Sequence, residues 1–248
     1  YSYSNEKTKI EVDTANENTL IGGLVGLNEE TGHVRFSFSK GEFKGYAVGG
    51  LVGTNKNYVY ESYADNTLTG KYVGGLAYSV SFGNGNELGS ISNCYTLSQL
   101  NGVDKHSVKS GFAYVIDYCS EGDNAGKYGL IYHCFSGVLF NEVGDNFFET
   151  HSRVRTETTH IMFFGKFDRV AGFIVDCIYD KKGREAEVIT QGALVGFFNP
   201  ITREPAIGLE TNECFDVNNF TAQEFSTNIW QFSADYYPEL INVVKVAN

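Results

Sequence analysis

Apolar and small residues recur along the chain in a fixed order. A β-branched residue is followed three positions later by Ser or Cys, and then by a large apolar residue. Five clear copies, a weaker one and a truncated one are present: Val34–Phe38, Val59–Tyr63, Ile91–Tyr95, Ile131–Phe135, Ile174–Ile178, then Thr211–Phe215, and Ser2–Tyr3. A Gly-rich apolar block recurs between them, at Gly22–Gly26, Gly49–Gly53, Gly74–Tyr78 and Gly192–Gly196. Such repetition is typical of stacked units and not of one globular core.

The spacing of the copies predicts the fold class. Ser37 and Ser62 are 25 residues apart, a length that holds two or three ordinary strands with their turns. No stretch shows the apolar spacing of an amphipathic helix. We therefore predict an all-β fold, a right-handed parallel β-helix (solenoid) of about seven irregular coils over residues 1–216. The paired glycines are expected at bends where neighbouring backbones approach closely.

The later repeats are longer because polar, Gly-rich segments are inserted near residues 80–90, 98–108, 120–127 and 141–160. We expect these inserts to project as loops and to supply recognition. The repeat pattern stops near Val217, so residues 217–248, which hold the only Trp, are expected to form a C-terminal cap over the last coil. Because Tyr1–Ser4 aligns with Phe36–Ser39, the chain begins within a repeat, and we expect it to be part of a longer parent chain.

The Ser or Cys position of the repeat predicts a column of small, buried side chains. Four of the five cysteines occupy it: Cys94, Cys134, Cys177 and Cys214. Two alternatives remain, namely disulfides between adjacent repeats and a zinc site that includes His133 and Cys134. Cys119 lies outside the column and is expected to be the exposed thiol.

The large residue that follows is the candidate binding position, with Phe38, Tyr63, Tyr95 and Phe135 as its clearest members. Strand alternation puts it on the face opposite the small column. Facing outward, these rings would suit stacking on sugar rings or docking of a partner; facing inward, they would be core. A bend would let both columns face inward. We favour core, because an exposed ladder of this size would be an unusually large apolar patch.

A polar column comprises Glu61, Asn93, His133 and Asp176, each directly before a Ser or Cys. Asn and Asp favour turns, so the column is expected to cap a bend. A glycosidase would need two carboxylates across a sugar. Glu61 and Asp176 would lie three repeats apart, about 14 Å, which is too far. No metallopeptidase, serine-hydrolase or nucleotide-binding motif occurs. The sequence therefore predicts a protein that is not an enzyme and has no catalytic, cofactor-binding or metal-binding residues.

The net charge of −11 argues against a nucleic-acid partner and against an anionic membrane surface. No apolar run approaches the ~20 residues of a membrane-spanning helix, so membrane insertion is not expected.

The Gly-Gly-Leu-Val-Gly blocks, followed by Val or Ile and then Ser or Cys before Tyr or Phe, resemble GLUG-motif repeats. Such repeats occur in bacterial filamentous-haemagglutinin-like adhesins and in the non-catalytic region of IgA-specific zinc metallopeptidases. The resemblance is strong over residues 19–100 and patchy over residues 101–215. The ending from Ile229–Trp230 to Tyr237–Leu240 resembles the close that often follows these repeats. The resemblance implies an extended β-solenoid at the cell surface and no catalytic residue.

These observations predict a secreted or cell-surface bacterial module, adhesin-like, that binds a host or bacterial surface protein or a glycan, or acts as a rigid stalk. One alternative is a carbohydrate-active β-helix enzyme, a polysaccharide lyase or hydrolase, which paired carboxylates within ~6 Å in a groove would favour. Another is a structural subunit of a surface filament that self-associates end to end.

Overall fold

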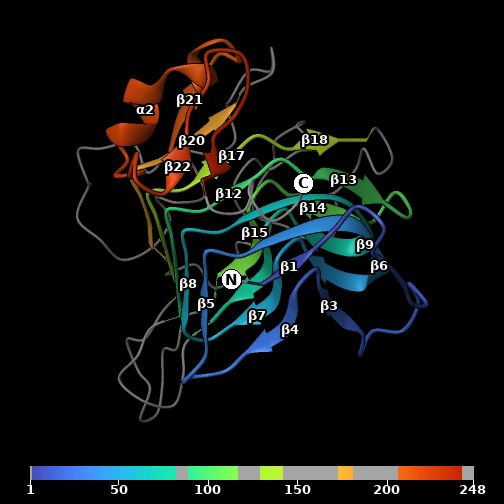
Figure 1. Cartoon of the computed structure of the whole chain (residues 1–248). Helices are drawn as coiled ribbons and strands as arrows, with labels where there is room; N and C mark the ends of the chain where they lie inside the picture. Colours follow the sequence, from blue (N-terminus) through green and yellow to red (C-terminus); the bar gives the residue numbers. More distant parts are fainter. Residues whose placement is uncertain (1, 82–88, 117–128, 142–172, 181–205, 242–248) are drawn as a thin grey trace.

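The computed structural model describes residues 2–81, 89–116, 129–141, 173–180 and 206–241. Parallel strands dominate these residues and form three sheets (Figure 1). The all-β prediction is confirmed. Among the described residues, no helix combines the length and apolarity needed to cross a membrane.

The three sheets, named A, B and C here, each draw one or more strands from successive repeats. Sheet A contains β1 (Tyr3–Ser4), β2 (Lys9–Glu11), β3 (Leu20–Gly22), β6 (Phe38–Gly49), β9 (Tyr63–Gly74), β12 (Tyr95–Thr96), β13 (Gln99–Gly102), β14 (Val108–Ser110), β17 (Phe135–Ser136), β18 (Leu139–Phe140), β20 (Cys177–Asp180) and β21 (Ala206–Leu209). Sheet B contains β4 (Val25–Asn28), β7 (Val52–Asn55), β10 (Ala77–Val80) and β15 (Ala113–Ile116). Sheet C contains β5 (His33–Arg35), β8 (Tyr58–Tyr60), β11 (Ser90–Ser92), β16 (Leu130–Tyr132) and β19 (Phe173–Val175).

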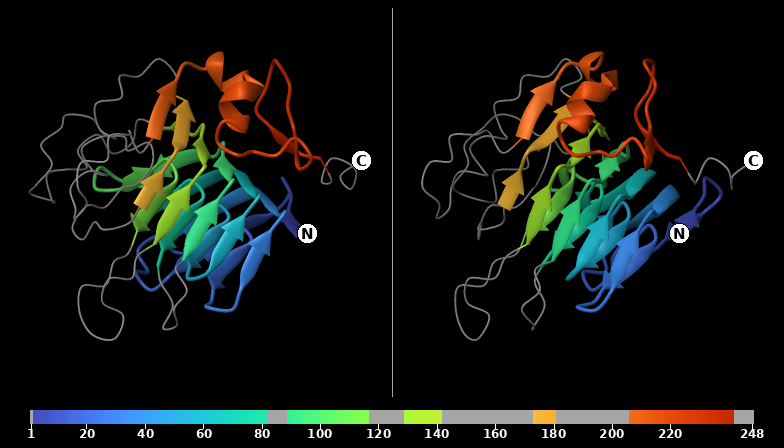
Figure 2. Two further views of the ribbon diagram at one scale, coloured as in Figure 1. Left: turned by 90° about the vertical axis from the view of Figure 1, so that its left-hand side faces the viewer. Right: turned by 60° about the vertical axis from the view of Figure 1, so that its left-hand side comes forward.

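Equivalent residues of successive repeats pair with one another, as the sequence alignment of the repeats predicts. In sheet A the paired residues are, in order, Tyr3, Phe38, Tyr63, Tyr95, Phe135 and Ile178. In sheet C they are Val34, Val59, Ile91, Ile131 and Ile174. Figure 2 shows the resulting progression of strands from the N-terminal repeat to the orange β20 and β21. The strand residues of the five clear copies of the motif therefore lie against one another in register.

The path of one repeat follows from its turns. The chain leaves sheet C after Arg35, bends at Phe36 and enters the long strand β6 of sheet A. At the end of β6 the pair Gly49–Gly50 leads into β7 of sheet B, from which a short turn reaches β8 in sheet C. The repeat thus contributes to sheets C, A and B in turn.

The paired glycines lie where backbones of the same and of neighbouring repeats meet, as predicted. A Cβ on Gly49 would lie 1.9 Å from the carbonyl oxygen of Val52, and a Cβ on Gly50 would lie 1.9 Å from that of Gly75. Both distances are far below van der Waals contact, so only glycine fits. In the fourth repeat the block is Ser110–Ala113, which the sequence pattern did not reveal.

The interior between the sheets is filled by the repeated apolar positions. Val59, Leu68, Val73 and Leu76 are at most 1 % exposed, and their counterparts in the adjoining repeats are buried as well. The buried side-chain amides of Asn28 and Asn55 adjoin this interior. Asn28 Nδ2 donates to Asn55 Oδ1 at 2.7 Å. Asn55 Nδ2 in turn donates to the Asn57 and Ser90 carbonyls. The amides therefore satisfy backbone groups at a turn that would otherwise lack partners.

The cysteines of the repeat column are buried and form no disulfide with each other. Cys94, Cys134 and Cys177 belong to the interior cluster, and all are in the thiol form. Burial raises the pKa of the Cys94 and Cys134 thiols above the ordinary value. The column of small buried residues is confirmed for these three positions, and the disulfide alternative is wrong for them.

The weaker copy Thr211–Phe215 does not continue the stack. Residues Glu213–Phe215 form a 3₁₀ helix, η2, and Cys214 lies in a different apolar cluster from the other cysteines. The next strand of sheet A is instead β21, in which Ala206 pairs with Cys177 and Ile207 with Ile178. The prediction was wrong because Glu213 and Asp216 favour a local turn: both side chains accept backbone N–H groups.

The insert at residues 98–108 contains a strand and is not wholly a projecting loop. Gln99–Gly102 form β13 beside β9, and only the turn at 103–107 projects, held by the Ser107 hydroxyl and the Asp104 carboxylate. The insert at residues 120–127, and most of those at 80–90 and 141–160, lie outside the described residues. So do Cys119 and the block Gly192–Gly196.

Candidate functional site: the bend column and the aromatic ladder

In the five clear copies of the motif, the residue before the Ser or Cys has a left-handed backbone conformation. Its φ is 51° at Phe36, 51° at Glu61, 48° at Asn93, 51° at His133 and 47° at Asp176. L-residues other than glycine rarely adopt such values. The predicted polar column is thus a column of bends, and Phe36 is a fifth member that sequence reasoning missed because it is apolar. We call these five positions the bend column.

The Ser or Cys that follows the bend closes it with a hydrogen bond. The Ser37 and Ser62 hydroxyls donate to the carbonyls of Arg35 and Tyr60, at 2.8 and 2.9 Å. The thiols of Cys94 and Cys134 make the equivalent contacts to Ser92 and Tyr132, with sulfur–oxygen distances of 3.1 and 3.2 Å.

In these four repeats the position therefore holds a small side chain that donates a hydrogen bond. Ser and Cys share both properties, which explains why either occurs there. Sequence reasoning attributed the position to size alone.

The aromatic residues after the small column project from the outer face of sheet A. Neighbouring rings stack, with centroids 5.1 Å apart for Tyr3–Phe38, 5.1 Å for Phe38–Tyr63 and 4.8 Å for Tyr63–Tyr95. These rings and Phe135 form the aromatic ladder. The ladder belongs to a different apolar cluster from the interior residues, so the bend has not turned both columns inward.

The C-terminal segment, residues 210–241, covers the ladder. It contains η2, the short helix α2 (Val217–Thr221) and an antiparallel pair of strands, β22 (Trp230–Gln231) and β23 (Glu239–Leu240). Trp230 lies 5.3 Å from the Tyr95 ring, and Phe220 lies 5.2 Å from the Phe135 ring. Figure 2 shows the red segment running back over the strands of several repeats. Its contacts with the ladder are thus on the flank of the stack, whereas the sequence suggested a cap over its last coil.

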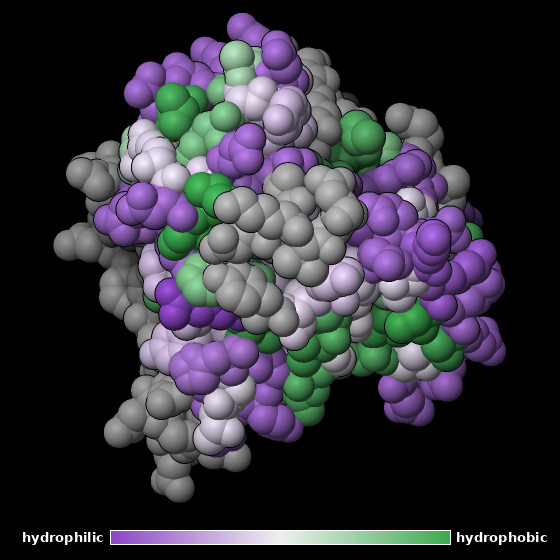
Figure 3. All heavy atoms as spheres, viewed as in Figure 1, coloured by the Kyte–Doolittle hydropathy of each residue, from purple (hydrophilic) through white to green (hydrophobic). Residues whose placement is uncertain are grey.

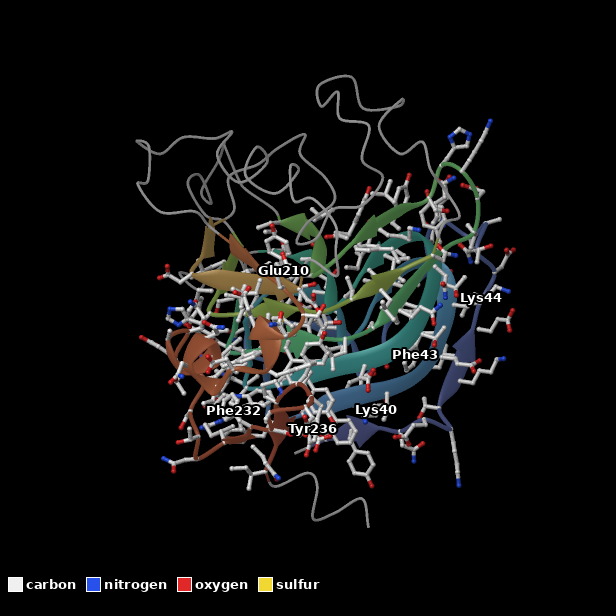
Figure 4. The ribbon with its side chains drawn as sticks, turned by 90° about the horizontal axis from the view of Figure 1, so that it is seen from above. Lys40, Phe43, Lys44, Glu210, Phe232 and Tyr236 are labelled. Carbon is white, nitrogen blue, oxygen red and sulfur yellow. The ribbon has the colours of Figure 1, made fainter. Side chains whose placement is uncertain are left out.

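The cover is limited to the first part of the long strands. Viewed from above, Phe232 and Tyr236 of the C-terminal segment lie at one end of sheet A, and Phe43 and Lys44 lie farther along β6 (Figure 4). Phe43 is buried in the interior, while Lys44 on the open part of the sheet pairs with Glu11.

The four candidate binding residues are therefore buried. Phe38 is 5 % exposed, Tyr63 6 %, Tyr95 2 % and Phe135 0 %, whereas Tyr3 at the end of the ladder is 50 % exposed. The structure brings the four together in one ladder, as the repeat predicts, but the C-terminal segment occupies their outer side. Their role in binding a ligand stays a prediction.

Polar contacts hold the C-terminal segment to the bend column. Asn93 Nδ2 donates to the carbonyl of Gln223 at 3.2 Å. The His133 ring lies between two carboxylates, with Nδ1 3.3 Å from Glu224 Oε2 and Nε2 3.9 Å from Asp176 Oδ2. The bend column thus presents its polar groups to the segment that covers the ladder.

A second tether lies near the end of the stack. The buried carboxylate of Asp180 accepts hydrogen bonds from the Tyr237 hydroxyl at 2.5 Å and from the Thr211 hydroxyl at 2.8 Å. Burial and the hydrogen bond to Asp180 raise the pKa of Tyr237 above its ordinary value. Asp180 of β20 thus holds both the start of the C-terminal segment, through Thr211, and its end, through the neutral phenol of Tyr237.

The geometry of the described histidines and acids does not assemble a metal site. The Cys134 thiol faces the interior while the His133 ring contacts Glu224, so the two cannot share a zinc ion. No group of three or more His, Cys, Asp or Glu side chains is placed to hold a metal within the described ranges. Of the other histidines, His33 stacks on Tyr58, His106 lies in the turn at 103–107, and His151 and His160 lie outside the described residues.

Among the described residues, one exposed pair of stacked aromatic rings lies on sheet C, in its first two strands, β5 and β8. His33 and Tyr58 stack with centroids 5.4 Å apart, and Tyr58 is 39 % exposed. The Arg35 guanidinium lies over the Tyr60 ring at 4.8 Å and pairs with Glu61 at 3.3 Å. Rings beside a guanidinium and a carboxylate can stack on a sugar face and bond its hydroxyls.

Comparisons with protein-family models, with curated proteins and with solved structures found no match to this chain.

Proposed function

We propose that the stacked repeats, through β21, are a right-handed parallel β-solenoid that serves as a non-catalytic module of a secreted or cell-surface bacterial protein, and that the C-terminal segment, residues 210–241, clamps its flank. The observation that carries the proposal is the in-register pairing of equivalent residues in successive repeats. Stacking of this kind gives length and stiffness from a short repeating sequence. The GLUG-like motif, which resembles adhesin repeats, supports the extracellular setting.

The outer surface fits such a role. On the face drawn in Figure 3, hydrophilic residues surround several smaller hydrophobic areas. Ion pairs link neighbouring repeats at Lys40–Asp65, Lys56–Glu29 and Lys71–Asp104. Charged pairs on an open sheet face keep such a surface soluble and discourage non-specific association.

The ligand-binding form of the proposal places recognition of a host or bacterial glycan on the outer face of sheet C, at His33, Arg35, Tyr58 and Tyr60. The exposed ring of Tyr58 would stack on a sugar, and Arg35 and Glu61 would bond hydroxyl groups.

The test is binding of the purified chain to a glycan array, repeated with Tyr58→Ala. Leu139→Ala is the matched control, because Leu139 is an exposed apolar residue (51 %) on sheet A. Binding that is lost with Tyr58→Ala and retained with Leu139→Ala supports the ligand-binding form. No bound glycan contradicts it and leaves the stalk form, which small-angle scattering tests through the length of the particle.

The non-catalytic part of the proposal has a separate test. The array glycans are incubated with the chain, and the products are assayed for new reducing ends and for unsaturated sugars. Product formation that depends on the folded chain would contradict the proposal and favour a carbohydrate-active enzyme.

A further inference from the structure

A lysine occupies an interior position of sheet A. Lys109 of β14 pairs with Val73 of β9, and the same column continues through Val48 to Ile21. The three apolar residues belong to the interior cluster, and Lys109 itself is only 1 % exposed. An ammonium group at such a position is costly unless its partners compensate for the lost hydration. The surroundings of Lys109 therefore indicate what this amine does.

The side chain of Lys109 reaches Asn141, which directly follows β18 in the next repeat. Nζ lies 2.8 Å from Asn141 Oδ1 and also donates to the main-chain carbonyl of Asn141. Since β18 pairs with β13, the two residues come from neighbouring repeats (Figure 1). A C=O bond is about 1.23 Å long, so Nζ lies no more than about 4 Å from Asn141 Cγ. The amine and the amide carbon are therefore close to the separation of reacting atoms, about 3–3.5 Å.

The backbone around Asn141 holds and polarises its side-chain amide. The main-chain N–H of Asn141 donates to the carbonyl of Leu100 at 3.0 Å, and the N–H of Gly102 donates to Asn141 Oδ1 at 3.2 Å. The Gly102 donor also identifies this atom as the oxygen and not the nitrogen of the amide. A backbone N–H directed at a carbonyl oxygen stabilises the negative charge that forms there during nucleophilic attack. Asn141 thus has the orientation and the donor that acyl transfer needs.

We propose that an amide bond forms between the side chains of Lys109 and Asn141. The neutral amine of Lys109 attacks Cγ of Asn141, so that an Nζ–Cγ bond forms and the Cγ–Nδ2 bond breaks. One proton moves from Nζ to Nδ2, which leaves as ammonia, and the reaction needs neither an oxidant nor a further reactant. A low-dielectric interior favours the neutral amine over the ammonium ion, and the neutral amine is the form that attacks.

The cross-link removes a charge from the interior and ties two repeats together. Lys109 and Asn141 are 32 residues apart in the sequence. The new bond closes this loop and therefore constrains the unfolded chain in the way that a disulfide does. Unlike a disulfide, it is not broken by reducing agents. The cross-link does not depend on which ligand the module binds.

The mass of the intact chain is the first test. Loss of one ammonia lowers the mass by about 17 Da relative to the mass calculated from the sequence. We expect this loss in the purified unmodified chain and its absence in Lys109→Met, which keeps an unbranched side chain in the interior column. Lys105→Met is the matched control, because Lys105 is exposed in the turn at 103–107, and this variant should keep the loss.

Trypsin digestion of the unmodified chain locates the bond. Trypsin cleaves after a free lysine but not after one whose amine is part of an amide. We therefore expect no cleavage after Lys109, and one product in which residues 106–127 and residues 128–153 are joined through their side chains. The digestion is made under reducing conditions, because Cys119 and Cys134 lie in these two peptides and a disulfide would also join them.

The two measurements together distinguish the cross-link from other losses of ammonia. A cyclic imide at Asn101–Gly102 would lower the mass equally, but it would join no peptides and would persist in Lys109→Met. The proposal is overturned if the unmodified chain has the full sequence mass, if Lys109→Met keeps the loss, or if trypsin releases residues 106–109. Each of these outcomes would leave Lys109 as a hydrogen-bonded residue of the interior. The digest of the unmodified chain gives its answer even if a variant fails to fold.

Discussion

The molecule contains two apolar clusters that are built on different principles. The interior cluster is made of repeated positions, so each residue packs against its own equivalents in the neighbouring repeats. The flank cluster joins the repeated aromatic ladder to residues that occur once, including Phe220, Phe225 and Trp230. Repetition thus specifies the stack, while a single unrepeated segment decides whether the ladder on its flank is open or covered.

The largest expected effect concerns the interior. Gly50→Ala would place a Cβ 1.9 Å from the Gly75 carbonyl oxygen and 2.9 Å from the Ala64 Cβ, so two repeats must separate. We expect a loss of more than about 3 kcal/mol in the free energy of unfolding, measured by urea denaturation.

Gly26→Ala is its control, because nothing lies within 4 Å of the added Cβ. It should change stability by less than about 1 kcal/mol. Equal losses in the two variants would show that the close approach of the glycine pairs does not hold the stack together.

A similar but local effect is expected in the flank cluster. Phe220 is fully buried and contacts Phe135, Phe225 and Phe232. Phe220→Ala should lower the free energy that holds the C-terminal segment on the ladder by about 3–5 kcal/mol. The emission of Trp230 should then shift to the red as its ring becomes hydrated, while amide exchange in β7 and β10 stays slow.

Tyr236→Ala lies in the same segment but removes an exposed ring, and its Trp230 emission should stay unchanged. Rapid amide exchange throughout sheet B in Phe220→Ala would mean that the two clusters unfold as one unit and are not independently built.

The repeats and the flank meet at the bend column, where a smaller effect is expected. Glu61→Val puts a β-branched residue at a φ of 51°, and Glu61→Gly puts there a residue that adopts this conformation freely. Both changes remove the contact with Arg35, so that loss cancels between them. The Val variant should be about 1–2 kcal/mol less stable than the Gly variant. Equal stabilities in chemical denaturation would argue against a strained bend at this position.

The smallest effect appears only at alkaline pH. Burial raises the pKa of Tyr63 and Tyr95 above the ordinary 10.0, so the unfolded chain ionises these phenols before the folded chain does. The stability that these groups contribute is complete below pH 10.0 and is lost as the pH rises from there toward the raised pKa.

Tyr63→Phe should therefore leave the free energy of unfolding nearly unchanged at neutral pH and lessen its fall near about pH 11. Buried Cys94 and Cys134 give the same sign of dependence in both proteins, so the comparison isolates Tyr63. If the free energy of unfolding falls equally at alkaline pH in the two proteins, the Tyr63 phenol is hydrated on the flank.

The repeat made much of the fold predictable. The register of Phe38, Tyr63 and Tyr95 and the place of the glycine pairs follow from aligning the copies, because equal residues at equal positions favour the same backbone. The fourth glycine block, Ser110–Ala113, escaped because Ser and Phe replace Gly and Leu there. The prediction that Cys214 continues the small column was wrong because its neighbours favour a local turn. Composition alone did not reveal that Ala206 takes this position instead.

The site was predictable only in part. Alternation correctly separated the aromatic ladder from the small column, and turn preference correctly placed a bend at Asn93 and Asp176. The docking of Trp230 and Phe220 onto the ladder is a contact between a repeated and an unrepeated region, so no internal alignment reports it. The hydrogen-bonding role of Ser and Cys needed coordinates, since size and donor capacity vary together in these two residues.

One consequence of the left-handed backbone before each Ser or Cys reaches beyond this molecule. Phe, Glu, Asn, His and Asp all occupy it with φ between 47° and 51°, so the geometry is dictated by the stack and tolerates almost any chemistry. Successive positions of the bend column are about 4.8 Å apart, the spacing of neighbouring strands, so functional groups could be placed there in a chosen order.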